Sequence, residues 1–354
     1  MPRVCATMTL HNELAQASET YRNNRRHIEA FTIRLRQARA ARRSTVVKIP
    51  VVVHVLHHNA AQNISDDQIQ SQIAVLNRDF RKLNADVAKT PPPFQQFLAD
   101  AMIEFELAVK DPDGQPTNGV TRTNTPIAVF RQDSNDPNRQ IIELDRKIKR
   151  AAGGGATAWP ADRYLNIWVC DMDRNPLGYA QFPGGAANTD GVVIDYKAFG
   201  ATGTAEVPYN LGRSATHEIG HWFDLLHIWG DDNMGCSGSD SVEDTPNQAG
   251  SNGGMPTFPH VSCNNGPNGD MFMNFMDYTD DAGMNMFTAG QVERMTASLN
   301  GPRASLLSSD GLTPPNHIAQ VRLPEFVAFM AAPELLARES GEATRKVFDG
   351  VGWV

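Results

Sequence analysis

Long apolar runs are missing from this 354-residue sequence. No stretch approaches the roughly 18 apolar residues that a membrane-spanning helix needs, so no membrane span is expected. The first 20 residues also lack the apolar centre of a secretory signal. If the protein is exported, its signal lies outside this sequence or its export follows another route.

Positive charge is also in short supply. The sequence has 32 Lys and Arg against 40 Asp and Glu, which gives a formal net charge of -8. A nucleic-acid binder needs a basic face that neutralises phosphates, so no nucleic-acid partner is expected. Arginine is concentrated in residues 22–43, where Glu29 is the only acid. This run is interpreted either as the solvated face of a helix or as part of a pro-segment removed by processing.

Cysteine is scarce as well, because four residues are too few for a disulfide scaffold. Cys170 ends an apolar run, residues 165–170, that predicts a buried strand, so a packed thiol is expected there. Cys236 and Cys263 lie in segments rich in Gly, Asn, Ser and Asp. A bond between them would hold a loosely structured region and would fit an oxidising compartment. Cys5 then remains unpaired near the N-terminus.

The order of the predicted elements indicates a mixed sheet with helices packed against it. Residues 48–56 are β-branched and almost continuously apolar, as in a strand covered on both faces. Ser65 and Gln68 match a capping box, and the apolar stripe that follows predicts a helix up to Phe80. Further elements are expected as strands at 103–109, 119–123, 165–170 and 190–194, an extended piece at 179–181 and a helix at 288–299. Residues 229–273 show little periodicity, and such a segment usually needs ions or disulfides.

The strongest motif is His-Glu-Ile-Gly-His at residues 217–221, followed by His227. On a helix, His217 and His221 project from one face toward a single Zn²⁺, and Glu218 is rotated enough to meet a water beside the metal. A catalytic zinc normally takes three protein ligands and keeps one position open. His227 is therefore the expected third ligand.

His227 can reach the metal only if the helix ends near Asp224 and the chain turns back. The pattern H-E-x-x-H-x-x-G-x-x-H of metzincins has glycine at this turn. Aspartate is one of the few other residues that adopt a positive φ, at a cost of about 1 kcal/mol. Two alternatives stay open: a continuing helix would make Asp224 itself a ligand, and a surface helix would leave the histidines without a metal.

These motifs, with Asn-Phe-Met-Asp-Tyr at residues 274–278, make the chain resemble the pappalysin family of metzincins, in particular the ulilysin-like enzymes. The likeness runs from residues 49–54 through 177–184 to 284–288, which spans most of residues 45–300. It implies an α+β fold: a twisted mixed β-sheet with a backing helix, an active-site helix above it, and an irregular C-terminal subdomain with a Met-turn. It also implies a secreted zinc-dependent endopeptidase that acts on proteins or peptides and is made as a latent zymogen.

The resemblance assigns roles to individual residues. Met276 matches the methionine of the Met-turn, a hydrophobic base beneath the metal, and Tyr278 matches a tyrosine that stabilises the tetrahedral intermediate. The strand residues Gly178, Tyr179 and Ala180 match an edge on which a substrate peptide lies extended. The remaining assignments are a family disulfide between Cys236 and Cys263, and a structural Ca²⁺ site at Asp240, Val242 and Thr245.

Three further positions bear on latency and specificity. Cys5, within Arg-Val-Cys-Ala-Thr-Met at residues 3–8, resembles a cysteine switch whose thiolate occupies the open zinc position; the alternative is an unpaired thiol in a flexible end. Cleavage beside Arg43 would then release the active form. Relatives that prefer Arg or Lys after the scissile bond carry an acid where this chain has Ala282, which leaves a basic preference open. Gly283 stands where relatives place a second disulfide cysteine, so that bond is not expected.

The predicted organisation is a pro-segment (1–45), an N-terminal catalytic subdomain (46–227), a C-terminal catalytic subdomain (228–305) and a tail of unknown role (306–354). The sequence indicates no oligomeric state. Zinc and structural calcium are the expected cofactors, and Glu218 is the expected general base. Two rivals are a catalytically impaired, zinc-containing peptide-binding module, which Asp224 favours, and a zinc amidase or deacetylase. The presence of both Glu218 and Tyr278 argues against the binding module.

Overall fold

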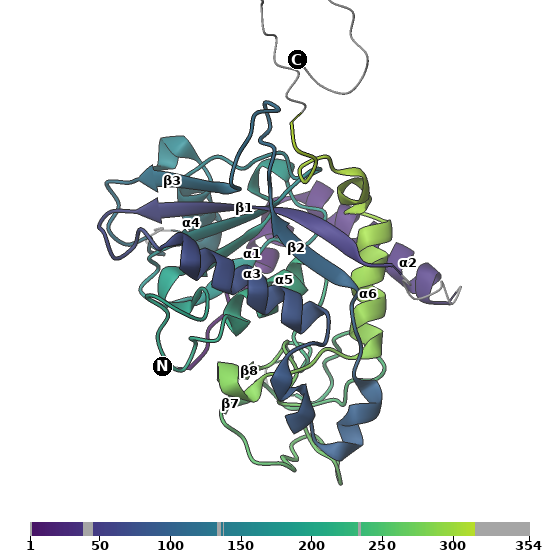
Figure 1. The fold of residues 1–354 in the computed structure, drawn as a ribbon. Helices are drawn as coiled ribbons and strands as arrows, with labels where there is room; N and C mark the ends of the chain where they lie inside the picture. Colours follow the sequence, from purple (N-terminus) through teal and green to yellow (C-terminus); the bar gives the residue numbers. More distant parts are fainter. Residues whose placement is uncertain (1, 38–44, 133–135, 137, 233–234, 316–354) are drawn as a thin grey trace, which may run out of the picture. The chain divides into compact units, whose positions relative to one another are not determined.

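A six-stranded β-sheet runs through the structure, a computed structural model that describes residues 2–37, 45–132, 136, 138–232 and 235–315 (Figure 1). The strand order is β2-β1-β4-β6-β5, and β3 pairs with β1 beyond the end of β2. All pairs are parallel except that β5 runs antiparallel to β6 at the edge. The mixed sheet is therefore confirmed. Its strands are β1 (Val47–His57), β2 (Ile103–Leu107), β3 (Val120–Asn124), β4 (Leu165–Cys170), β5 (Gly178–Ala180) and β6 (Val192–Asp195).

Helices cover both faces of this sheet. Side chains alternate between the two faces of a strand, so the strands contribute to two separate buried clusters. Val51, Val53 and Val55 of β1 belong to the same buried cluster as the apolar residues of α3, α5 and α6. Trp168 and Cys170 of β4 belong to a second cluster, with α4 and the first residues of the chain. Both free thiols, Cys170 included, are buried. The helices are α1 (Thr7–Ala17), α2 (Glu19–Gln37), α3 (Asp66–Phe80), α4 (Gln140–Ile148), α5 (Arg213–Trp222) and α6 (Ala289–Asn300).

The starts of α3 and α6 show how far local sequence sets the helix boundaries. Ser65 caps α3 by accepting a hydrogen bond from the Gln68 backbone, but the Gln68 side chain binds the carbonyls of Tyr196 and Phe199 instead of closing the box. The predicted capping box at Ser65 is thus only half formed. A complete capping box starts α6, between Thr288 and Gln291.

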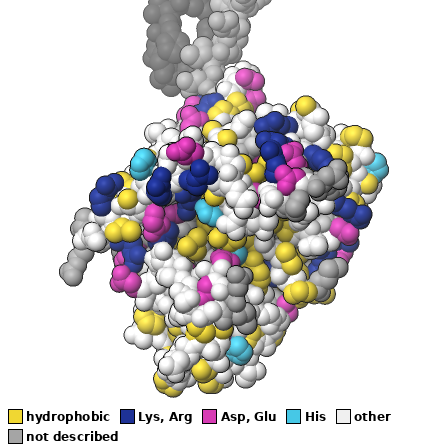
Figure 2. Space-filling model, turned by 180° about the vertical axis from the view of Figure 1, so that it is seen from behind, with side chains coloured by type: hydrophobic (Ala, Val, Ile, Leu, Met, Phe, Trp, Pro, Cys, Tyr) yellow, Lys and Arg dark blue, Asp and Glu magenta, His cyan; other side chains and the backbone are white. Residues whose placement is uncertain are grey.

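The irregular segment between α5 and α6 contains the predicted disulfide. Cys236 and Cys263 are bonded, with 5.5 Å between their Cα atoms. Two short strands, β7 (Gly253–Gly254) and β8 (Tyr278–Thr279), pair in parallel and connect this segment to the chain after Met276. On the face shown in Figure 2, Lys and Arg side chains lie among Asp and Glu side chains in the upper part, and the lower part carries few basic side chains.

The N-terminal helices lie against the body of the protein. Helix α1 contacts α4, and α2 contacts α6, beside which it lies in Figure 1. Residues 1–315 form one compact unit, which includes the first ten residues of the predicted tail. The proposed cleavage position beside Arg43 and residues 316–354 lie outside the described residues. No helix in the described part of the chain has the length and apolar character needed to cross a membrane.

Candidate active site

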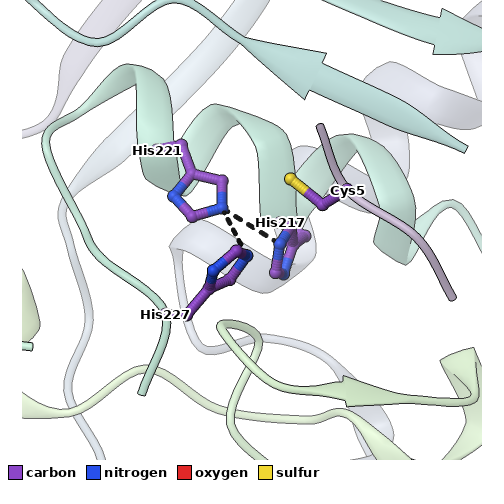
Figure 3. A group of neighbouring side chains, drawn as sticks. All are labelled: Cys5, His217, His221 and His227. Atoms are coloured by element: carbon purple, nitrogen blue, oxygen red, sulfur yellow. Dashed lines mark hydrogen bonds between the residues drawn. The ribbon is translucent and has the colours of Figure 1, made fainter. Parts of the chain in front are cut away.

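The zinc motif lies on α5, as its spacing predicts. His217 and His221 stand one turn apart on this helix, and both are buried. Figure 3 shows their rings facing that of His227, which comes from the loop after the helix. The helix itself packs against α3, β5 and β6, so the framework of the sheet fixes the position of the two histidines.

The turn that brings His227 to the helix is made at Asp224. Its φ is +77°, in the left-handed region that glycine occupies at no steric cost. The Asp224 N–H donates to the carbonyl of His221 (2.8 Å), and the Leu225 N–H donates to that of Gly220 (3.0 Å), which closes the helix. The helix therefore does not continue through Asp224. Its carboxylate forms ion pairs with Arg25 and Arg294.

The three imidazoles present their Nε2 atoms to one another. His221 Nε2 lies 3.1 Å from the Nε2 atoms of both His217 and His227 (Figure 3). Each Nδ1 faces an acceptor at short range: the Phe275 carbonyl for His217 (2.7 Å), the Leu225 carbonyl for His221 (2.7 Å) and the Asp231 carboxylate for His227 (2.8 Å). Because an acceptor facing Nδ1 places the ring proton there, all three Nε2 lone pairs converge on one point.

This arrangement fits a zinc ion. Burial lowers the pKa of His217 and His221 well below the usual range, so both rings are neutral, as metal ligation requires. Three unprotonated nitrogens at such distances repel one another unless a cation lies between them, and zinc binds imidazole at about 2.0–2.1 Å. The acceptors on Nδ1 orient the rings, as partners of metal-bound histidines commonly do. Asp231, four residues after His227, is such a partner and was not predicted.

Cys5 completes the group. Its Sγ and one nitrogen of each of the three histidines all lie within 4.8 Å of one another, and Figure 3 shows the sulfur directed toward the imidazoles. The segment around Cys5 runs along β5: Leu177 N–H donates to the Val4 carbonyl (2.9 Å), and Ala6 N–H donates to the Gly178 carbonyl (3.1 Å). The predicted cysteine switch therefore lies beside the predicted metal ligands, and Cys5 is not a thiol in a free end.

Glu218 is buried next to this segment. Its Oε2 accepts hydrogen bonds from the Cys5 thiol (3.2 Å) and the Thr7 hydroxyl (2.9 Å). Burial raises the pKa of Glu218 to about 7. Strand β5 passes so close that a Cβ on Gly178 would lie 2.9 Å from Glu218 Cγ, which explains glycine at that position. Thr7 was missed in the sequence because a lone threonine carries no recognisable motif.

The edge strand β5 divides its residues between two sides. The Gly178 carbonyl and the Ala180 N–H bind the N-terminal segment, the latter through Thr7 Oγ1 (2.8 Å). The Tyr179 ring points the other way, into the cluster with α4, where it faces the buried ammonium group of Lys149. Of the three residues predicted to bind substrate, Gly178 and Ala180 offer backbone groups at the edge, and Tyr179 supports the strand from behind.

Tyr278 and Met276 lie close to the three histidines. The Tyr278 ring lies 5.0 Å from that of His227, edge to face, and its hydroxyl donates to the Cys5 carbonyl (3.4 Å). Met276 is fully buried against α5, since a Cβ at Gly220 would come within 2.5 Å of its sulfur. Tyr278 therefore borders the His227 ring, and Met276 packs against the helix that carries the other two histidines.

A buried ion pair near the three histidines and Cys5 was not predicted. Arg3 Nη2 lies 2.6 Å from Asp281 Oδ1, and the same guanidinium donates to Ser214 Oγ (3.0 Å) and to the Thr279 carbonyl (3.2 Å). We call the Asp281 carboxylate, Ser214 Oγ and the Thr279 carbonyl, which bind this guanidinium, the Asp281 site. The resemblance placed the acid of basic-specific relatives at Ala282, and Asp281 is the residue directly before it.

The predicted calcium residues also lie together. Asp240 Oδ1 accepts from the Val242 N–H (3.0 Å) and from the Thr245 hydroxyl (3.0 Å). The Thr245 hydroxyl is also 3.0 Å from the Val242 carbonyl. Burial raises the pKa of Asp240 to about 7. These contacts bring the oxygens of the three residues together.

Sequence comparison finds relatives with the same motif. The peptidase M43 family, described as pregnancy-associated plasma protein-A, matches residues 154–300. An extracellular metalloprotease of Verticillium alfalfae (strain VaMs.102) is 36% identical over 207 residues, which cover 57% of this chain and 70% of the relative. Similar fungal proteins, such as one from Colletotrichum graminicola (31% identical over 229 residues), are also named extracellular metalloproteases.

Solved structures agree with the sequence relatives. Mature mirolysin from Tannerella forsythia, in complex with a cleaved peptide, is 52% identical, with a TM-score of 0.72, covering 77% of this chain and all of the other. A promirolysin mutant from the same organism is 47% identical, with a TM-score of 0.74, covering 86% of this chain and 97% of the other. The chain therefore belongs to the pappalysin family of metzincins, peptidase M43, and is a zinc metalloendopeptidase.

Proposed function

We propose that His217, His221 and His227 hold the catalytic zinc and that Glu218 is the general base. The convergence of the three Nε2 atoms carries this proposal: His221 Nε2 lies 3.1 Å from the other two, and the Cys5 thiol beside them binds the Glu218 carboxylate. When bound, zinc supplies a Lewis acid that polarises the scissile carbonyl and acidifies water. Glu218 takes a proton from the attacking water and passes it to the leaving amine nitrogen.

Tyr278 and β5 complete the site in this proposal. The Tyr278 hydroxyl, which reaches the Cys5 carbonyl in the latent chain, donates a hydrogen bond to the oxyanion that forms on the substrate carbonyl. Backbone groups of Gly178 and Ala180, which bind the N-terminal segment here, pair with an extended substrate once that segment has left. Both roles need the same space that residues 4–7 occupy.

Residues 1–45 act as a latency segment in this account, with Cys5 as the switch. Replacing Cys5 with alanine removes the side chain that lies against the three histidines. It is expected to raise the initial rate of the uncut chain on a small fluorogenic peptide by more than about tenfold, which corresponds to about 1.4 kcal/mol. Mass spectrometry of the assayed sample establishes that the chain is still intact.

Cys170→Ala is the matched control, because Cys170 is also a buried free thiol but packs on the other face of the sheet. That variant stays as latent as the parent. A Cys5→Ala chain that remains equally latent would show that Cys5 adds no latency beyond that of the rest of the bound segment.

The Asp281 site accepts a basic side chain of the substrate in this proposal. Arg3, two residues before Cys5, is 3% exposed, and its guanidinium meets the Asp281 carboxylate beside the metal cluster. A substrate residue next to the scissile bond then takes the same place after the segment leaves. Ala282 thus does not argue against a preference for Arg or Lys after the cut.

Asp281→Asn is expected to lower kcat/KM for peptides with Arg after the cut by about 100-fold, since losing one partner of a buried ion pair costs about 3 kcal/mol. The same variant leaves kcat/KM for matched Leu peptides nearly unchanged. Asparagine can still accept from the N–H groups of Leu211 and Arg213, which Asp281 Oδ2 binds. Asp280→Asn is the control of equal charge, and an equal loss for both peptides would refute the assignment.

Two finer parts of the proposal concern calcium and location. The gathered oxygens of Asp240, Val242 and Thr245 support a structural Ca²⁺ site, because hard carboxylate and carbonyl oxygens suit that ion. The Cys236–Cys263 disulfide and the names of the extracellular relatives support secretion.

A further inference from the structure

The side chain of Asp224 has a feature that its role in the turn does not explain. Glycine makes this turn without strain, whereas aspartate at φ +77° adopts it at a steric cost. Its carboxylate is also buried, with a side-chain exposure of 1%, and a buried charge is costly unless it is paired. A carboxylate at this position therefore needs partners, and the structure shows two.

The first partner belongs to the N-terminal segment. Arg25 of α2 places Nη1 2.6 Å from Asp224 Oδ1. The same nitrogen donates to the Pro183 carbonyl (3.1 Å), and the guanidinium lies over the Phe182 ring at 4.8 Å. Asn24 adds a hydrogen bond to the Gly184 carbonyl (3.0 Å). Helix α2 thus contacts both the motif turn and the loop that follows β5.

The second partner belongs to the catalytic domain and leads back to α2. Arg294 of α6 pairs with Asp224 Oδ2 (3.2 Å) and donates through Nε to its carbonyl (3.2 Å). Its two terminal nitrogens bind both oxygens of Glu29, at 3.1 and 3.0 Å. Since Arg25 and Glu29 are four residues apart on α2, they share one face of that helix.

Arg25, Asp224, Arg294 and Glu29 form a row of side chains whose charges alternate in sign. The two residues on α2 are neutral as a pair, and so are the two on the catalytic domain. Arg25 and Glu29 leave with α2, whereas Asp224 and Arg294 remain and pair with each other. With glycine at position 224, Arg25 would lose its acid, and Arg294 would lose its partner once α2 departs. Asp224 therefore pairs with Arg25 while α2 is bound, and it balances the charge of Arg294 after α2 has left.

We propose that Asp224 is a docking site for α2, which holds residues 1–37 on the catalytic domain independently of Cys5 and of the metal. The surface formed by Asp224, Arg294 and the loop at residues 182–184 takes a helix that carries Arg and Glu four residues apart, and the occupant is α2 of this chain. One consequence is that a cut between residues 37 and 45 leaves the segment bound. The inference rests on the proposed latency role of residues 1–45.

The test measures retention of the cut segment, not activity. A recognition site for a sequence-specific protease is placed within residues 38–44 of the full chain, with Glu218→Gln to prevent self-digestion and Cys5→Ala to remove the switch. After cutting, size-exclusion chromatography and a dilution series give the dissociation constant of the N-terminal fragment. The fragment is expected to co-elute with the catalytic domain.

Arg25→Gln in this background is expected to raise that dissociation constant by at least about tenfold, because it leaves Asp224 with one partner fewer. Arg26→Gln is the matched control: Arg26 is exposed, contacts Asn23 of its own helix and should leave retention unchanged. Asp224→Asn keeps a residue that tolerates positive φ, and its effect should not add to that of Arg25→Gln.

Equal retention of the Arg25→Gln and Arg26→Gln fragments would overturn the proposal, as would complete release of the fragment by Cys5→Ala alone. Neither outcome depends on hydrolysis. A failure of the proposed catalytic roles would instead appear as activity that survives changes in Glu218 or the histidines, with retention unaffected.

Discussion

Replacing Glu218 with glutamine is expected to lower peptide-bond hydrolysis by at least about 10³-fold, within the range that general acid–base catalysis contributes. The side chain keeps its length and loses only its charge, so the fold around α5 should persist. What disappears is the carboxylate that takes the proton of the attacking water. Because the metal is held by histidines, bound zinc should remain at one per chain.

The measurement combines casein hydrolysis, after removal of residues 1–45, with zinc analysis of the same sample. Glu243→Gln is the control, since the Glu243 side chain is 93% exposed and lies on the surface. Undiminished hydrolysis by the Glu218 variant would exclude this residue as the base. Loss of zinc together with activity would instead give Glu218 a structural role.

The positions of the zinc residues could be read from the sequence because helix geometry alone aligns His217 with His221. The third histidine required a turn, and the known tolerance of aspartate for positive φ was sufficient to predict it. Met276 and Tyr278 followed from resemblance and not from pattern, since an isolated methionine or tyrosine carries no signal of its own.

The residues that were missed depend on contacts between distant segments. Arg3 and Asp281 are 278 positions apart, and no periodicity relates them. Arg25 belongs to a run whose charge pattern fitted a solvated helix equally well, and only the packing of α2 on α6 shows that its guanidinium meets Asp224. The capping box at Ser65 is half formed for the same reason. The Gln68 side chain donates to the distant carbonyls of Tyr196 and Phe199 instead of to the helix start.

Removing zinc from the active enzyme is expected to abolish hydrolysis and to lower the melting temperature. The three converging Nε2 atoms lose the cation that balances their lone pairs, and a ligand at about 1,000 times its dissociation constant stabilises the folded state by about 4 kcal/mol. Both effects should reverse when zinc is returned. His227→Ala is expected to lose zinc as well, since two histidines leave the site incomplete.

His260→Ala is the control for that variant. The His260 side chain is 48% exposed and pairs with Asp270, and neither residue belongs to the metal cluster. Its metal content and melting temperature should follow those of the parent. Equal zinc binding by the His227 and His260 variants would remove His227 from the ligand set.

The most direct test of a zinc peptidase built on His217, His221 and His227 is a zinc titration of the metal-free protein lacking residues 1–45. Bound zinc and the rate of casein hydrolysis are measured in the same samples. The rate should rise in proportion to bound zinc and reach its plateau at one zinc per chain, with no such rise in His227→Ala. Full hydrolysis by the metal-free protein, or an unchanged titration of the His227 variant, would contradict it.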